Sequence, residues 1–266
     1  MANKNLFIPL NKAHSNKCPI SYQNRIWIEK SFSTLLELFG EEKVKRAKVL
    51  IPDYSNFPIK YNGEVQTAFK TLKIIAEKME VEFHEIQLVL YDEDVKKISI
   101  GTTGLGHTFL NSIDNEKGSA GLYWGRQPDN KYHIGLERRN LIQPEIMIAT
   151  LAHEIAHIKL LGENKIQIND EKLTDLTTVI FGLGIFNANA AFQTIKGLNS
   201  IGWRKMGYLS ENEWGYALSI FAFIRGESTP YWVEHLAFNI KAGFNQGKRY
   251  IEDKDLVLSS VKNPIS

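Results

Sequence analysis

One predicted helix, between Pro144 and Gly162, constrains the fold most, because it carries ionisable side chains within an otherwise apolar stretch. Pro144 suits the first turn of a helix and Gly162 suits its C-terminal cap, so these two residues bracket the element. His153 and His157 are four residues apart, which puts both imidazoles on one face. Two histidines and Glu154 would be costly to bury on such a helix unless they share a partner.

The centre of this helix, His153-Glu154-Ile155-Ala156-His157, is an H-E-x-x-H motif. Imidazole is a good zinc ligand, and catalytic zinc usually takes three protein groups with a water in the fourth position. Glu154 lies about 100° round the helix axis from His153, and in such motifs this carboxylate acts as general base toward the zinc-bound water. Because zinc lowers the pKa of that water towards about 7, a carboxylate can accept its proton. The motif therefore predicts a Zn2+ ion on His153 and His157, with Glu154 as the catalytic residue.

The third zinc ligand is expected from the helix that follows. The metzincin extension needs a glycine three residues after the second histidine and a histidine six residues after it, but Leu160 and Glu163 stand there, so that class is excluded. Glu171 and Asp175 share a face near the start of the next helix, and the segment 162–168 is long enough to reverse the chain. Glu171 is the favoured ligand. Asp175 is the alternative ligand, or else accepts a hydrogen bond from a ligand histidine. Carboxylates in a first helical turn are also expected from the helix dipole alone.

The order of predicted elements indicates an α+β fold, not alternating βαβ units. Helical spacing of apolar residues covers 22–48 and 64–79, and helices dominate again from Pro144 onward. The strand candidates between these regions are 83–91, 97–100, 120–124 and 132–137. The later helices are expected to run from Asn169 or Asp170 to about 192, over 210–225 and over 230–243. We expect a small, mostly antiparallel sheet with a backing helix, a zinc helix and a glutamate helix, followed by a helical C-terminal region.

Composition gives no indication of a nucleic-acid or membrane partner. The net charge is +2 and the basic residues are scattered, so we expect neither nucleic acid nor a membrane surface as partner. The single cysteine, Cys18, excludes an intramolecular disulfide and suits a reducing compartment. The first residues lack the long apolar core of a secretion signal, and the uncharged stretch 176–192 is interpreted as a buried helix. A cytoplasmic protein is expected.

The five site residues also resemble a known family. Gluzincins, the thermolysin-like clan of zinc metallopeptidases, carry H-E-x-x-H followed by an E-x-x-x-D helix, and the matching positions here are His153, Glu154, His157, Glu171 and Asp175. The arrangement is also similar to that of ImmA/IrrE-type peptidases, compact intracellular enzymes that cleave regulatory proteins. The resemblance covers roughly 64–190. It implies a zinc metallopeptidase that acts on a peptide or protein substrate.

The resemblance also implies an arrangement of domains and substrate. A zincin-like core is expected over 61–194, between an N-terminal helical extension over 1–60 and a helical C-terminal region over 195–266. In the clan, an edge strand before the zinc helix aligns the substrate backbone, and 132–136 is placed for that role. The equal alternative for 132–136 is a plain sheet strand with a glycine bulge.

Candidates to stabilise the oxyanion formed during hydrolysis are Tyr208, Tyr231 and His235, by residue type only. Two alternatives to an enzyme remain at this point. One is a catalytically silent, zinc-stabilised binding or regulatory module of zincin fold, although Glu154 argues against it, because a structural site needs only ligands. The other is a helical scaffold without metal, in which the motif arose by chance.

Overall fold

The computed structural model describes residues 17–92, 121–196, 201–205 and 207–254, and these form two compact units. Unit 1 takes the described residues of Met1–Val49 and Leu209–Ser266, and unit 2 takes those of Leu50–Tyr208. The α+β fold class is confirmed. The three-part division of the chain expected from the sequence stays a prediction.

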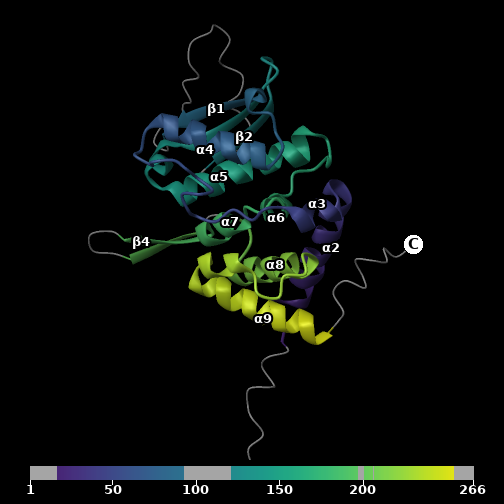
Figure 1. The fold of residues 1–266 in the computed structure, drawn as a ribbon. Coiled ribbons are helices and arrows are strands. Elements are labelled where there is room, and N and C mark those ends of the chain that lie inside the picture. Colours follow the sequence, from purple (N-terminus) through teal and green to yellow (C-terminus); the bar gives the residue numbers. More distant parts are fainter. Residues whose placement is uncertain (1–16, 93–120, 197–200, 206, 255–266) are drawn as a thin grey trace, which may run out of the picture. The chain divides into compact units, whose positions relative to one another are not determined.

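Unit 2 contains both sheets and the helix that carries the H-E-x-x-H motif, which is labelled α5 in Figure 1. Its helices are α4 (Val65–Lys78), α5 (Pro144–His157), α6 (Glu171–Ile180) and α7 (Gly184–Ala190). Its strands are β1 (Ile86–Tyr91), β2 (Gly121–Arg126), β3 (Tyr132–Glu137), β4 (Phe192–Lys196) and β5 (Ile201–Lys205). The expected strand 97–100 lies outside the described residues.

The three-stranded sheet has the order β1-β3-β2 and is mixed. β1 runs parallel to β3, with Ile86 opposite Tyr132, while β2 is antiparallel to β3, with Gly121 opposite Leu136. The expectation of a mostly antiparallel sheet is therefore wrong for the β1–β3 pair. Parallel pairing needs a long return connection, and here β2 and residues 93–120 lie between the two strands in the chain. The expected edge strand 132–136 belongs to β3, which is central, and β2 is an edge of this sheet.

α5 is the central helix of unit 2, and it contacts α4, α6, α7, β2 and β3. Leu151 and Ile155 on this helix are fully buried, as are Leu72 and Ile75 of α4, so the two helices share a core. After His157 the helix continues through one π-helical turn, Ile158–Gly162, as the bracketing residues predicted. The Tyr132 hydroxyl donates a hydrogen bond to the Gly162 carbonyl at 3.0 Å, and a Cβ at Gly162 would lie 2.7 Å from the Tyr132 ring. Only glycine allows this close approach.

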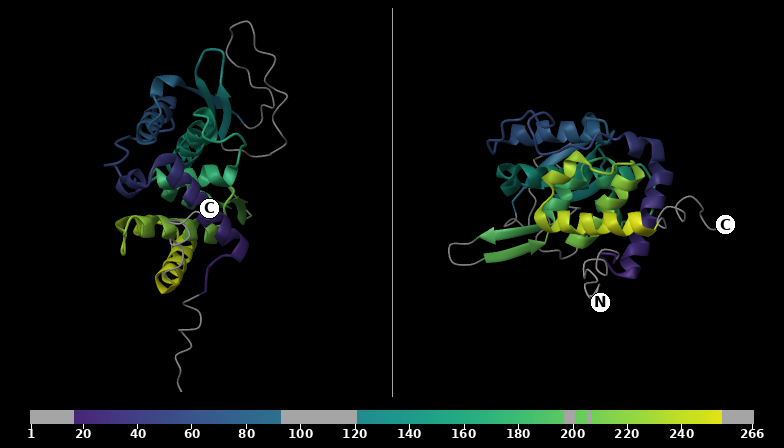
Figure 2. Two further views of the ribbon diagram at one scale, coloured as in Figure 1. Left: turned by 90° about the vertical axis from the view of Figure 1, so that its right-hand side faces the viewer. Right: turned by 60° about the horizontal axis from the view of Figure 1, so that its bottom comes forward.

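The helix expected from 169 to 192 is interrupted. α6 ends at Ile180, and Gly182 adopts a φ of +79°, which turns the chain before α7 begins at Gly184. β4 and β5, which were not expected, then pair as a separate antiparallel ribbon (Figure 2).

Unit 1 is helical among its described residues. Its helices are α2 (Tyr22–Phe39), α3 (Glu41–Arg46), α8 (Glu211–Ile224) and α9 (Phe238–Lys254). The single helix expected over 22–48 is broken at Gly40, whose φ is +88°. Buried Glu29 of α2 accepts hydrogen bonds from Arg25 at 3.0 Å and from the Tyr216 hydroxyl of α8 at 2.7 Å, and these tie the two helices together. Nowhere in the described part of the chain is a helix both long and apolar enough to cross a membrane.

Candidate metal centre

Three side chains from α5 and α6 form a cluster of suitable donors. His153, His157 and Glu171 each offer one ligand atom, and these atoms all lie within 4.8 Å of one another. Glu171 Oε2 is 3.1 Å from His153 Nε2 and 3.3 Å from His157 Nε2. One carboxylate oxygen therefore faces both imidazoles. Two imidazole nitrogens and a carboxylate oxygen are a donor set that zinc and other divalent transition metals accept.

Asp175 lies on the other side of His153, away from the three donor atoms. Its Oδ1 is 2.9 Å from His153 Nδ1, and its Oδ2 accepts the backbone N–H of Tyr208 at 2.9 Å. Donation of the Nδ1 proton to this buried carboxylate fixes the imidazole so that Nε2 points toward Glu171. Asp175 therefore orients His153.

Glu171 and Asp175 share a face of α6 because the helix begins just before them. Asp170, not Asn169, is the N-cap, and its side chain accepts the backbone N–H of Leu173 at 3.1 Å. This cap makes Glu171 the first helical residue and places Asp175 one turn further along the same face.

His157 is held from two sides by residues that the sequence did not single out. The Tyr123 ring of β2 stacks on the imidazole, with 5.4 Å between ring centroids and 10° between planes. Thr174 Oγ1 lies 3.5 Å from His157 Nδ1 and donates its own proton to the Asp170 carbonyl, so it can accept from the imidazole. Thr174 follows Glu171 by three residues, and helical spacing could have found it. Tyr123 gives no such signal, because it is remote in the chain.

Glu154 is buried beside the cluster and is only 4% exposed. Its Oε2 has no hydrogen-bond partner among the described residues. Burial raises the pKa of Glu154 to about 8, with the charge of His153 opposing the shift and that of Glu171 adding to it. A divalent cation nearby would lower this pKa again, because positive charge favours the carboxylate. The group is thus able to take up a proton near neutral pH.

Gly121, the first residue of β2, provides the room that Glu154 occupies. A Cβ at position 121 would overlap Glu154 Oε1 and would lie 2.5 Å from Thr150 Cγ2. A methyl group there would force the carboxylate to move. No local pattern in the sequence marks this glycine, because its partner is on a different element.

The three side chains of the cluster have pKa values that are shifted in different directions. Burial alone would lower the pKa of His153, but hydrogen bonds to Asp175 and Glu171 outweigh it and raise that pKa to about 10. Burial lowers the pKa of His157. Burial opposes ionisation of Glu171, but hydrogen bonds from His153 and His157 outweigh it and hold the Glu171 pKa well below its usual range. In the metal-free site, His153 is accordingly protonated at neutral pH beside an ionised Glu171.

Metal affinity is expected to rise with pH, because a metal must displace the proton on the His153 imidazole. With a pKa of about 10, His153 holds this proton throughout the neutral range. The apparent zinc affinity should therefore increase about tenfold per pH unit for each proton displaced. Chelator competition at several pH values, corrected for the protonation of the chelator, measures the slope. A zinc affinity that does not change with pH would contradict this charge arrangement.

Of the candidates for stabilising an oxyanion, Tyr208 lies near the site. Its ring is 6.1 Å from the His153 ring, with 21° between planes. Tyr231 and His235 belong to unit 1, where the Tyr231 hydroxyl donates to the Val49 carbonyl at 2.9 Å.

Comparison with known proteins finds no match among family models, curated proteins or solved structures. The gluzincin resemblance therefore stays a prediction, which rests on the five motif residues.

Proposed function

We propose that this chain is a zinc-dependent metallohydrolase, and specifically a metallopeptidase of the gluzincin type. One observation carries the proposal: the partnerless oxygen of Glu154 is buried beside a three-donor cluster. A purely structural metal site needs only its ligands, and burying a further acidic group beside them would destabilise the fold without benefit. This argues against the silent binding module.

In this proposal, His153, His157 and Glu171 hold the zinc ion, and Asp175 orients His153 from behind. The ligand set of two histidines and one glutamate is one that catalytic zinc uses with its fourth position open. When bound, zinc supplies a Lewis acid that polarises a carbonyl oxygen and makes a water more acidic.

Glu154 acts as general base and then as general acid. Its carboxylate takes a proton from the attacking water as the new carbon–oxygen bond forms, and it returns that proton to the amine nitrogen as the carbon–nitrogen bond breaks. A base with a pKa near neutrality can perform both transfers, and burial moves the pKa of Glu154 in that direction. No oxidant or further co-reactant is needed.

The substrate we infer is a peptide or protein segment, aligned by β2. This strand is an edge of the described sheet, and it begins at Gly121 beside Glu154 and carries Tyr123 against His157. An extended peptide that pairs with such an edge gains backbone hydrogen bonds and places its carbonyls in register. The aligning role expected for 132–136 therefore moves to β2.

The purified protein is expected to contain about one zinc ion per chain, because the described residues offer one such cluster. Elemental analysis after dialysis measures the metal, and mass spectrometry of new amino termini in a peptide library measures hydrolysis. Protein that cannot be loaded with zinc would refute the proposal. Stoichiometric zinc with no cleavage of any peptide would support the silent module instead.

Gly121→Ala is expected to lower hydrolysis about 100-fold, because displacing a catalytic group by about 1 Å has an effect of this size. Zinc content should not change, since Gly121 supplies no donor atom to the cluster. Rates on a library peptide and metal content provide the two readouts. Gly243→Ala is the matched control, because a Cβ there would be 3.4 Å from its nearest neighbour, an ordinary contact. If Gly121→Ala retains the wild-type rate, the carboxylate does not depend on this space.

A further inference from the structure

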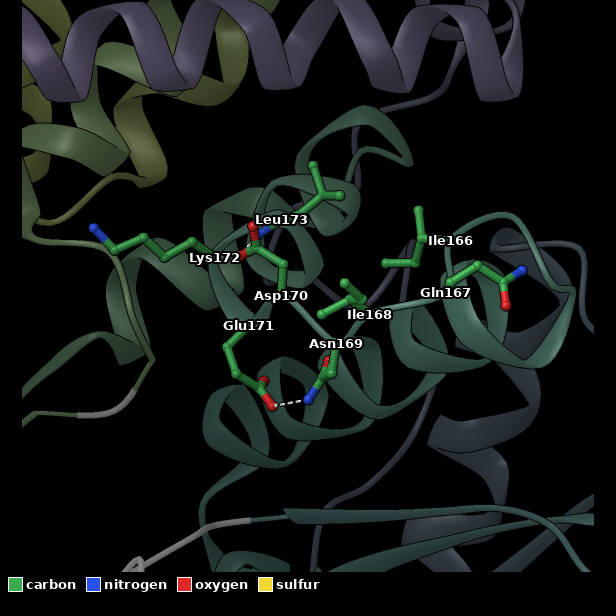
Figure 3. A pocket seen from close by; sticks show the side chains of 8 residues that line it. All are labelled: Ile166, Gln167, Ile168, Asn169, Asp170, Glu171, Lys172 and Leu173. Carbon is green, nitrogen blue, oxygen red and sulfur yellow. Dashed lines mark hydrogen bonds between the residues drawn. The ribbon is translucent and has the colours of Figure 1, made fainter.

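The two oxygens of the Glu171 carboxylate have different partners. Oε2 faces the Nε2 atoms of His153 and His157, at 3.1 and 3.3 Å. Oε1 instead accepts a hydrogen bond from the Asn169 side-chain amide at 2.7 Å. Figure 3 shows this bond at the edge of an open hollow lined by residues 166–173. One oxygen is thus turned toward the candidate metal position while the other is held by an amide.

The backbone places Asn169 for this contact. Asp170 caps α6, so Glu171 is its first residue and Asn169 lies just outside the helix. The capped helix start restricts the backbone on both sides of Asp170. Local structure therefore keeps the side chains of Asn169 and Glu171 close to each other. Asn169 is itself exposed and is not needed to fill the core.

The number of carboxylate oxygens that bind decides whether a coordination position stays open. Two imidazoles and one oxygen leave the fourth tetrahedral position free for water or substrate. Binding through both oxygens of Glu171 would fill that position with a protein atom. A hydrogen bond to Oε1 opposes this, because the amide engages that oxygen and fixes the rotation of the carboxylate.

We propose that Asn169 is a positioning residue that restricts Glu171 to binding zinc through Oε2 alone and so keeps a coordination position open. The inference rests on the proposed function of the cluster as a zinc centre. It assigns a role to a residue that contributes no metal ligand and no catalytic proton.

The test uses the full chain with cobalt in place of zinc, because the visible absorption of cobalt reports its coordination geometry. Asn169→Ala and Asn169→Leu both remove the amide, and leucine keeps a side chain of similar length. Relative to wild type, each variant should lose roughly half or more of its molar absorption in the visible range as the coordination number rises. Zinc binding, measured by chelator competition, should weaken about tenfold, the lower end of the effect of losing an outer partner.

Gln167→Ala is the matched control, since Gln167 is exposed, lines the same hollow and points away from Glu171 (Figure 3). It should leave both the absorption spectrum and the zinc affinity unchanged. Wild-type spectra in both Asn169 variants would overturn the inference while leaving the zinc centre intact. A wild-type protein that binds neither metal would overturn the proposed function itself. If one Asn169 variant fails to fold, as judged by circular dichroism, the other decides the result.

Discussion

Glu154→Gln is expected to keep its zinc and to lose peptide hydrolysis by a factor of about 10³ or more. Glutamine has nearly the shape of glutamate but cannot accept a proton from water, and proton transfer by a positioned side chain contributes about 10²–10⁴-fold to rate. Glu154 is not one of the three donors, so the metal site should survive. Zinc content and the rate of peptide cleavage, measured on the same preparation, separate the two effects.

The control for this prediction is Glu145→Gln, in the first turn of the same helix. Glu145 is exposed, so its neutralisation should change neither zinc content nor rate. A Glu154→Gln variant that cleaves peptide at the wild-type rate would remove Glu154 from the mechanism. A variant that loses its zinc would indicate that Glu154 supports the metal site as well.

His157→Ala is expected to lower zinc affinity by more than about 100-fold. Losing an outer partner of a metal ligand already costs about 10- to 100-fold, and this substitution removes a ligand itself. The remaining pair, His153 and Glu171, would hold the ion through two atoms only. Zinc at about 100 times the wild-type dissociation constant should stabilise the wild type by about 2.7 kcal/mol and the variant by far less.

Chelator competition and thermal unfolding with and without zinc measure this loss. His84→Ala is the control, because the His84 side chain is 79% exposed and lies in the same unit as the cluster. A His157→Ala variant with wild-type affinity would mean that zinc binds elsewhere. The variant should still fold, since α5 also packs through residues such as Leu151 and Ile155.

Much of the α+β organisation could be predicted from local patterns. α4 and α5 lie where apolar spacing and the residues Pro144 and Gly162 predicted helices. Two of the expected helices were too long, because a backbone turn at Gly40 or Gly182 interrupts a continuous apolar pattern. Periodicity measures which residues are buried, and it does not show where a glycine with positive φ ends one helix and starts another.

The sheet could not be predicted to the same extent. Strand segments near 86–91 and 132–137 were expected, but the edge position expected for 132–136 and the antiparallel direction expected for most of the sheet were wrong for β3 and for the β1–β3 pair. The alternation of apolar and polar residues within a strand shows which side of the strand faces the core. Which strand it pairs with depends on the path of the connecting chain between the two strands. The central position of β3 and the edge position of β2 therefore emerge only in the folded chain.

For the candidate metal centre, the sequence by itself determined which side chains share a helix face. His153 with His157, and Glu171 with Asp175, follow from the four-residue period of a helix, which depends on local hydrogen bonds alone. Only the tertiary structure decided which atoms meet. It brings Glu171 Oε2 to both Nε2 atoms, Asp175 to Nδ1 of His153, and Gly121 beside Glu154. These contacts join different elements, so their geometry is set by the packing of α6 and β2 against α5.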